Sequence, residues 1–281
     1  SGVSTPIAHG DCVATAPSAP RLAEEMRVRF PSPPPFLASA NLTLTIMALT
    51  PQEIRNIYVL QSRNVREIGK YRVQLLRDLN RSLQRGEETA VQAKTRLYAL
   101  LYSAWSEAQF IQILHTPSAF HGSEIDKVKN TKSSNGIGAA WREMIEVSFA
   151  RAGSVATNIS LQRQKQLVLT VVEDHVEGMA LTRNKIAHGQ WIVALNRKNT
   201  AENPSMTTVL ASLDFVRVDV SFRVHEFLGR IIRDLMQSPK KGHFRDFWTN
   251  YSNLDAFLGH SLSWSSASKK RELEKKKASL A

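Results

Sequence analysis

Residues 158–189 read NISLQRQKQLVLTVVEDHVEGMALTRNKIAHG, and the apolar periodicity of this stretch decides the fold. Apolar side chains recur three, four or seven residues apart, which predicts one long helix with a single buried face. Asn158 or Ser160 is suited to cap the first turn, and Gly189 is suited to stop or bend the last one. The predicted apolar face consists of Leu161, Val168, Val172, Val176 (or His175 in its place) and Met179.

The N-terminal part of the chain predicts a helical hairpin. Thr50 can cap a helix in which Pro51 takes the first position and Glu53 completes a capping box. This helix is expected to run from Pro51 to near Gly86, and a second one is expected from 87 to about 115. Because the link between them is short, the two helices are expected to pack antiparallel.

Further helices are expected over 139–150, over 219–238 with Asp219 as the cap, and over 244–262. The polar stretches 122–138 and 196–204 are predicted to be loops. Residues 206–218 are ambiguous, since their β-branched bias also suits a short strand. The sequence therefore predicts an all-α protein, a bundle of four to five long helices that includes the N-terminal hairpin.

The same pattern suggests four segments. Residues 1–46 are rich in proline and are expected to form a disordered tail or a leader. Residues 47–89 would be a basic helix that forms an arm of the bundle, and 90–262 the main helical domain. Residues 263–281 would be a basic tail, solvated whether or not it is helical.

The chain carries a net charge of +12, and residues 53–85 alone hold eight basic and three acidic side chains. Such a surface is either simply solvated or a binding face for a polyanion, with no distinction between RNA and DNA. The single cysteine, Cys12, cannot form an internal disulfide and fits a reducing, cytoplasmic compartment. No apolar run reaches the roughly 18–20 residues of a membrane span, so no membrane partner is expected.

The end of the long helix, Arg183-Asn184-Lys185-Ile186-Ala187-His188, carries residue types suited to RNA cleavage. Histidine titrates near neutral pH and can move the protons of the 2′-hydroxyl and of the leaving 5′ oxygen. The Arg183 guanidinium can pair with phosphate oxygens and stabilise charge in the transition state. Asn184 could orient the histidine or contact the phosphate. This chemistry needs no metal and no cofactor, and the sequence has no ligand spacing that argues for one.

The spacing of these residues leaves the geometry open. Asn184 and His188 are four apart and share one helix face, whereas Arg183 and His188 lie roughly 140° apart around the axis. Either the helix end unwinds at Gly189 or a second copy of the helix completes the site. A surface arginine near a helix-end histidine that satisfies a carbonyl or the helix dipole would leave the same pattern.

The segment RNKIAHGQW resembles the signature of the HEPN superfamily, in which Arg, a polar residue that is often Asn, three more residues and His end a long helix of an α-bundle. Arg183, Asn184 and His188 match these positions, and the resemblance covers about 90–262. It implies a HEPN-like fold and a homodimer in which two motifs form one cleft. It also implies a metal-independent endoribonuclease that leaves a 2′,3′-cyclic phosphate and a 5′-hydroxyl.

Many members of that superfamily act in bacterial antiphage defence or as toxins, which makes an inhibitory or regulatory protein partner an expectation here. Other members are inactive and bind nucleotides or partners, so a non-catalytic helical module that binds nucleotide, nucleic acid or protein remains the alternative. Toxins of this kind that are silenced by AMP transfer carry Tyr two residues after the histidine. This chain has Gln190 there, which argues against that form of control.

Several other residues are secondary candidates. Glu107 on the second helix is predicted to line the cleft, although an exposed helix carboxylate is the plainer interpretation. Lys185 could touch phosphate or remain solvated, and His175 is expected to be a core or boundary residue more than an acid–base partner. The tryptophans Trp105, Trp141 and Trp191 are expected in the core.

Overall fold

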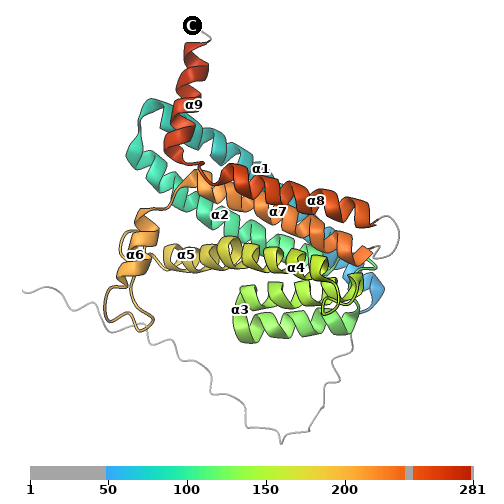
Figure 1. Cartoon of the computed structure of the whole chain (residues 1–281). Coiled ribbons are helices and arrows are strands. Elements are labelled where there is room, and N and C mark those ends of the chain that lie inside the picture. The colour runs from blue at the N-terminus through green and yellow to red at the C-terminus, as the bar shows by residue number, and fades with distance from the viewer. Residues whose placement is uncertain (1–48, 238–242, 280–281) are drawn as a thin grey trace, which may run out of the picture. The chain divides into compact units, whose positions relative to one another are not determined.

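The amphipathic stretches form a bundle of antiparallel and crossing helices, shown in Figure 1. The computed structural model describes residues 49–237 and 243–279, which belong to one compact unit, Met47–Ala281. Its elements are α1 (Pro51–Arg85), α2 (Glu88–Leu114), α3 (Gly122–Ala152), α4 (Ile159–Val171), the π-helical turn η1 (Val172–Glu177), α5 (Gly178–Ala187), α6 (Pro204–Ala211), α7 (Phe215–Gln237), α8 (His243–Ser261) and α9 (Ser266–Ala278). Within these residues there is no strand, only an isolated bridge between Leu195 and Glu202. The predicted all-α fold class is confirmed.

The N-terminal hairpin forms as predicted. Thr50 caps α1 through a capping box with Glu53, whose backbone nitrogen donates to Thr50 Oγ1 at 3.3 Å. The helix ends at Gly86, and α2 returns along α1. The predicted segment boundary between 89 and 90 therefore falls inside the first turn of α2, and α1 is part of the same compact unit as the rest of the bundle.

The helix predicted from residue 158 runs as α4, η1 and α5 in one rod. Asn158 Oδ1 accepts a hydrogen bond from the backbone nitrogen of Leu161 at 3.0 Å, which confirms the predicted cap. The turn Val172–Glu177 is π-helical, with hydrogen bonds reaching one residue further than in an α-helix. The rod ends at His188, and Gly189 leaves it with φ at 79°.

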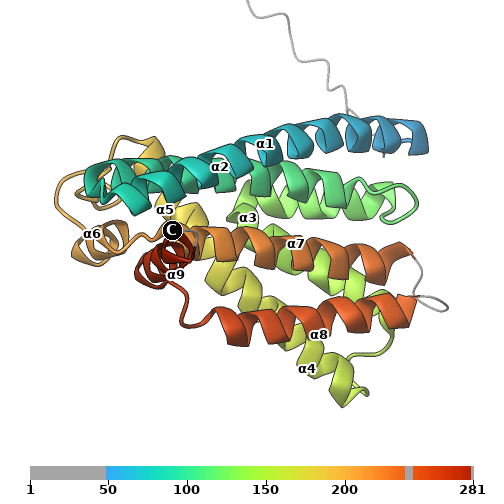
Figure 2. The ribbon, with the colours of Figure 1, turned by 90° about the horizontal axis from the view of Figure 1, so that it is seen from above.

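Helix α2 lies between α1 and α7, and α8 covers the other side of α7, as Figures 1 and 2 show. The rod of α4, η1 and α5 crosses these helices, with η1 against α3 and α7 and with α5 against α2. This crossing brings the end of α5 to the middle of α2, which is what positions the candidate site.

An aromatic cluster joins α2 to α7. Phe222 on α7 is fully buried, and its ring centre lies 5.2, 5.0 and 5.2 Å from those of Tyr98, Tyr102 and Trp105 on α2. The Arg72 guanidinium of α1 lies over the same ring, 4.4 Å from its centre. A single phenylalanine of α7 therefore contacts side chains from both α1 and α2.

Arg72 also carries the polar connection between α1 and α7. Its guanidinium pairs with Asp219 at 2.9 Å and with Glu226 at 2.6 Å, and its side chain is only 15% exposed. The Tyr98 hydroxyl donates to the same Asp219 oxygen at 2.7 Å. Burial is the main cause that raises the pKa of Tyr98, followed by the charge of Asp219, so the phenol stays a hydrogen-bond donor.

The predicted loop at 122–138 is wrong, because these residues begin α3. Glu124 closes a capping box at His121, accepting from the His121 backbone nitrogen at 2.8 Å. Ile125 and Val128 are fully buried and anchor the helix to the core. Most other residues of this stretch are polar or glycine, and many of them are exposed, as at Lys127, Lys129 and 133–136, so the composition resembles that of a loop. Only Gly136, with φ at 87°, departs from helical geometry inside α3.

The possible strand at 206–218 is also absent. Asn203 caps α6 by accepting from the Met206 backbone nitrogen at 3.1 Å, and Leu210 is buried. Asp219 is not a cap either, since α7 begins at Phe215. Asp214 takes that role, accepting from the backbone nitrogens of Val216 and Ser266, both at 2.7 Å. One carboxylate thus fixes the starts of both α7 and α9.

Some expectations lie outside the described residues. One is the tail or leader at 1–46, with Cys12, and another is the end at residue 238 of the helix predicted over 219–238. The basic segment 263–281 contains α9, which contacts α1 and α7. Among the helices that the structure describes, none combines the length and apolar character required to cross a membrane.

Replacing Asp219 with Ala should destabilise the fold by about 3 kcal/mol, because it leaves Arg72 short of a partner in a desolvated position and Tyr98 without an acceptor. Urea unfolding followed by circular dichroism measures the change. The matched control is Asp78→Ala, which removes an exposed pair with Arg81 and should cost less than about 1 kcal/mol. Equal losses for the two variants would contradict the proposed importance of this contact.

Candidate active site

Arg183 is held on α2 by specific hydrogen bonds. Its Nε donates to Ser103 Oγ at 3.0 Å, and one terminal nitrogen donates to Glu107 Oε1 at 2.6 Å. The other terminal nitrogen donates to Asn184 Oδ1 at 3.1 Å. The guanidinium is therefore fixed in orientation although its side chain remains 33% exposed.

Glu107 lies between two cations. Besides Arg183, it faces Lys132 of α3, whose Nζ is 3.6 Å from Glu107 Oε2. Lys132 also lies over the Phe110 ring, 5.7 Å from its centre. Arg183, Glu107 and Lys132 together carry one net positive charge, so the cluster attracts an anion while the carboxylate limits the attraction.

A pocket of about 190 Å³ opens beside this cluster, between α2, α3 and the rod of η1 and α5. Its polar lining includes Ser103, Ser106, Lys132, Arg183 and Asn184, and α3 contributes Gly136 at its break. The positive φ of Gly136 is one that side chains rarely tolerate, so the glycine permits the break where α3 lines the pocket.

His188 is not among the residues that line this pocket, although Asn184, which shares its helix face, is. Its backbone nitrogen donates to Asn184 O at 3.2 Å, and its exposed side chain follows Asn184 along one helix face. The imidazole makes no hydrogen bond within the described part of the chain. The helix does not unwind before His188, which leaves Arg183 and His188 of one copy directed apart.

Residues after the motif fold back onto it. Lys185 Nζ donates to the carbonyl of Leu195 at 2.5 Å, and Gln190 Oε1 accepts from the Leu195 backbone nitrogen at 2.8 Å. Arg96 of α2 donates to the carbonyl of Trp191 at 2.8 Å. These contacts occupy Lys185, so the lysine serves the loop rather than the pocket.

Two further histidines, on η1 and α7, contact side chains of α7 and α2. His175 Nδ1 is 3.2 Å from Ser221 Oγ, and burial lowers its pKa, with the Asp174 charge opposing and the Arg217 charge adding to the shift. His225, which the sequence analysis passed over, is fully buried with Nδ1 3.2 Å from the Tyr102 hydroxyl. Burial lowers the pKa of His225 to about 3, with His175 as a smaller cause, so both imidazoles are neutral structural groups.

The tryptophan prediction holds for Trp105 and Trp141, which are buried, and is wrong for Trp191, which is 36% exposed. Trp191 follows the chain reversal at Gly189 and so sits on the outer loop. The structure thus groups Arg183, Asn184 and Glu107, adds Ser103 and Lys132, and leaves His188 exposed nearby. The sequence could not have identified Ser103 or Lys132 as site residues, because each is a single polar residue on a helix and belongs to no motif.

In chemical terms, one copy offers a fixed guanidinium, an ammonium, a carboxylate, an amide and three hydroxyl-bearing side chains around a small pocket, and an exposed imidazole close to it in the sequence. No cluster of three or more His, Cys, Asp or Glu side chains that could hold a metal ion occurs among residues 49–237 and 243–279. Comparison with protein-family models, with curated proteins and with solved structures gave no match to this chain.

Proposed function

We propose that this protein is a metal-independent endoribonuclease of the HEPN type that acts as a homodimer. The observation that carries the proposal is the state of the motif RNKIAH: Arg183 is oriented at a polar pocket, while His188 is exposed and makes no hydrogen bond among the described residues. A structural histidine would be expected to hydrogen-bond within the fold, which His188 does not. Arg183 does bond to Ser103, Glu107 and Asn184, so it supports the proposal only through its place in the wall of the pocket.

The proposed reaction is attack of a ribose 2′-hydroxyl on the adjacent phosphorus. His188 removes the 2′ proton and then delivers it to the departing 5′ oxygen, and the products are a 2′,3′-cyclic phosphate and a 5′-hydroxyl. Arg183 pairs with the phosphate oxygens and stabilises the charge that builds on them. Asn184 positions this arginine, and Lys132 binds a neighbouring phosphate of the same strand.

A second copy supplies the missing half of the site. Because Arg183 and His188 of one chain point apart, a single phosphate can meet both only if the two come from different chains. Exposed apolar side chains that flank the motif in the sequence favour such pairing: Leu181 is 62% and Ile192 73% exposed, and Leu181 shares a helix face with Asn184 and His188. The four apolar residues Leu181, Trp191, Ile192 and Val193 are together termed the motif patch.

A non-catalytic nucleic-acid-binding module is the second candidate. The ion pair between Arg183 and Glu107 favours it, because a guanidinium already bound to a carboxylate is less available to a phosphate. The two candidates differ in one result. The nuclease cleaves RNA and loses cleavage on mutation of His188, whereas the module binds RNA without cleaving it.

The first prediction for this site concerns His188→Ala, which should lower the rate of RNA cleavage by about 10²–10⁴-fold, the usual contribution of a general acid or base. Cleavage of a fluorescent single-stranded RNA measures the rate, and mass spectrometry identifies the cyclic phosphate. The control is His260→Ala, an exposed histidine of α8 that should leave the rate unchanged. Full activity of the His188 variant would remove the catalytic proposal.

The second prediction concerns pairing through the motif patch. Leu181→Glu places a charge on the patch and should convert the dimer to a monomer with little remaining cleavage, as measured by sedimentation and by the RNA assay. Leu60→Glu, at a position 58% exposed on α1, is the matched control and should remain dimeric and active.

Mixing inactive variants tests where the site forms. Equal amounts of Arg183→Ala and His188→Ala proteins should regain part of the activity, because one of the two composite sites in a mixed dimer is intact. No recovery, despite exchange of subunits, would place Arg183 and His188 of one chain in the same site and contradict the composite arrangement.

The third prediction concerns Lys132. Lys132→Gln in a His188→Ala background should weaken RNA binding and reduce the slope of log Kd against log salt by about 0.7, the value for one phosphate contact of a single strand. Fluorescence anisotropy across a salt series measures it. Lys127→Gln alters another lysine of α3, one paired with Glu143 outside the pocket, and should leave the slope nearly unchanged. Equal slopes for both variants would exclude Lys132 from the RNA path.

A further inference from the structure

Helix α1 runs along an outer edge of the bundle (Figure 2), and its outward face is exposed from end to end. Ten positions between Gln52 and Gln84 recur three or four residues apart, and they lie within a sector of about 80° around the helix axis. This sector is roughly opposite Ile54 and Leu79, which are buried. All ten residues are exposed, four are Gln or Val, none is acidic, and the remaining six form what is here termed the basic stripe: Arg55, Arg63, Arg66, Lys70, Arg77 and Arg81.

The basic stripe differs from an ordinary solvated helix face in how its charges are placed. Exposed helices commonly mix both signs, because opposite charges three or four residues apart stabilise a helix and like charges at these spacings destabilise it. Here Arg63 and Lys70 each lie one turn from Arg66, and Arg81 lies one turn from Arg77. The resulting repulsion is unfavourable for the isolated helix and is relieved when a polyanion binds.

Four of these side chains are free to bind such a partner. Lys70 pairs with Glu67 at 2.7 Å and Arg81 with Asp78 at 3.1 Å, from acids at the flank of the stripe. The other four members, all arginines, make no hydrogen bond or ion pair with any residue that the structure describes. A guanidinium keeps its charge at any physiological pH, and its planar fork matches two phosphate oxygens.

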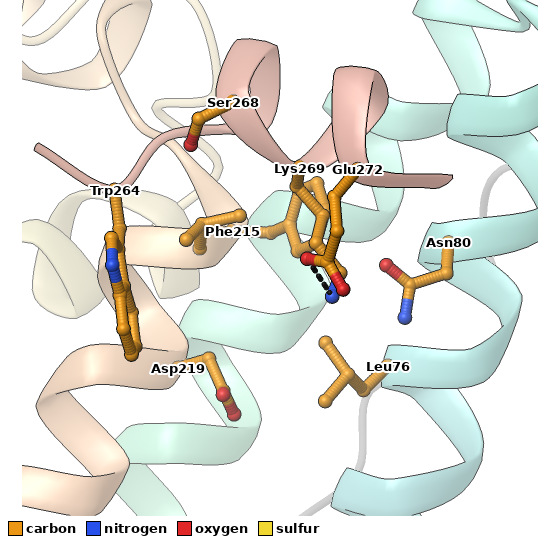
Figure 3. Close-up of a pocket in the computed structure, with 9 residues that line it drawn as sticks. Leu76, Asn80, Phe215, Asp219, Trp264, Ser268, Lys269 and Glu272 are labelled. Carbon is orange, nitrogen blue, oxygen red and sulfur yellow. Dashed lines mark hydrogen bonds and ion pairs between the residues drawn. The ribbon is translucent and has the colours of Figure 1, made fainter. Parts of the chain in front are cut away.

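Helix α9 extends the positive surface at one end of the stripe. Figure 3 shows α9 beside Leu76 and Asn80 of α1, on the face that neighbours Arg77 and Arg81. This helix carries six basic and two acidic residues, and Lys270 and the residues that follow it are mostly exposed. The surface formed by α1 and α9 therefore has an excess of positive charge over its whole length.

The shape and composition of the basic stripe favour a nucleic-acid duplex over other polyanions. From Arg55 to Arg81 it spans roughly 39 Å of straight helix. Sites for single strands combine a groove with aromatic side chains on which bases stack, and membrane-surface helices insert Trp, Phe or Leu. The stripe is convex and has only Val59 and Val73 between its charges, while the exposed Tyr71 lines a groove on the α2 side. A duplex is rigid and dense in phosphates, so a straight row of arginines can contact it without touching a base.

We propose that the basic stripe, with α9 beside it, binds the phosphate backbone of a double-stranded segment of RNA without reading its bases. The choice of RNA over DNA rests on the proposed nuclease function, whereas the contact with paired strands rests on the stripe itself. This surface is separate from the pocket at Arg183, so it holds a structured RNA independently of cleavage.

Removing charge from the stripe tests the contact. In the full-length His188→Ala protein, glutamine at three stripe positions should weaken binding of an RNA duplex of about 20 base pairs by at least about tenfold, and should reduce the slope of log Kd against log salt by about 3, one for each phosphate contact. Fluorescence anisotropy across a salt series measures both. The three substitutions are Arg63→Gln, Arg66→Gln and Arg77→Gln.

A matched control removes the same amount of charge elsewhere. Three exposed basic residues of α4, of the loop after the motif and of α7 are replaced together, and the slope should stay nearly unchanged: Arg163→Gln, Lys198→Gln and Arg230→Gln. Equal losses in the two triple variants would show that only net charge matters and would overturn the proposal.

A second set of substitutions separates charge from folding. Lysine in place of Arg63, Arg66 and Arg77 keeps the charges, so this variant should keep the salt slope of the parent protein. Circular dichroism and Tm should be alike for the lysine and glutamine variants, because all three positions are exposed. If the lysine variant loses as much of the slope as the glutamine variant, the assignment to phosphate contacts is wrong.

Three further partners test the choice of duplex RNA. These are one strand of the duplex alone, a DNA duplex of the same sequence, and lipid vesicles with about 30% phosphatidylserine. The glutamine variant should lose more affinity for the RNA duplex than for the single strand. A greater loss for the single strand, tighter binding of DNA than of RNA, or vesicle binding through the stripe in place of duplex binding would overturn the proposal. Because no cleavage is measured, failure of the nuclease proposal would leave these results intact.

Discussion

The architecture depends on the burial of Phe222. Three aromatic side chains of α2 surround its ring, and Arg72 of α1 lies over it, so one residue of α7 sets the distance between three helices. Arg72 in turn needs Asp219 and Glu226 of the same α7, because an unpaired guanidinium at this depth would be costly. The apolar and the ionic contacts therefore support each other, and α2 acquires a fixed position from which its other face can hold the candidate site.

That other face of α2 presents Ser103 and Glu107 to α5. Their contacts with Arg183 form the polar part of the α2–α5 packing, and they direct the guanidinium into the pocket instead of toward His188. Glu107 has two opposing effects on the proposed chemistry. It orients Arg183, and it also neutralises part of the charge that Arg183 and Lys132 would offer to RNA. In the proposed reaction a phosphate would have to compete with this carboxylate, which would limit unspecific binding of polyanions to a basic protein.

Helices with a clear apolar period and a recognisable cap were predictable from the sequence, as at Thr50 and Asn158. The first half of α3 was not, because only Ile125 and Val128 are buried there and the remaining residues resemble a loop in composition. For the candidate site, the motif supplied Arg183, Asn184 and His188, whose roles remain proposals. Lys132 was not foreseeable, since it comes from the misassigned stretch and reaches Glu107 only through tertiary packing.

The π-helical turn at Val172–Glu177 has a consequence for how the motif should be recognised. Such a turn acts as one inserted residue, and each residue advances a helix by about 100°. It thus sets how α5 is rotated about the helix axis relative to α4. As a result, η1 packs against α3 and α7, while Arg183 of α5 faces α2. Deleting one residue there would leave every letter of RNKIAH intact yet swing Arg183 away from Ser103 and Glu107. An intact motif is therefore only meaningful together with the helical register that delivers it.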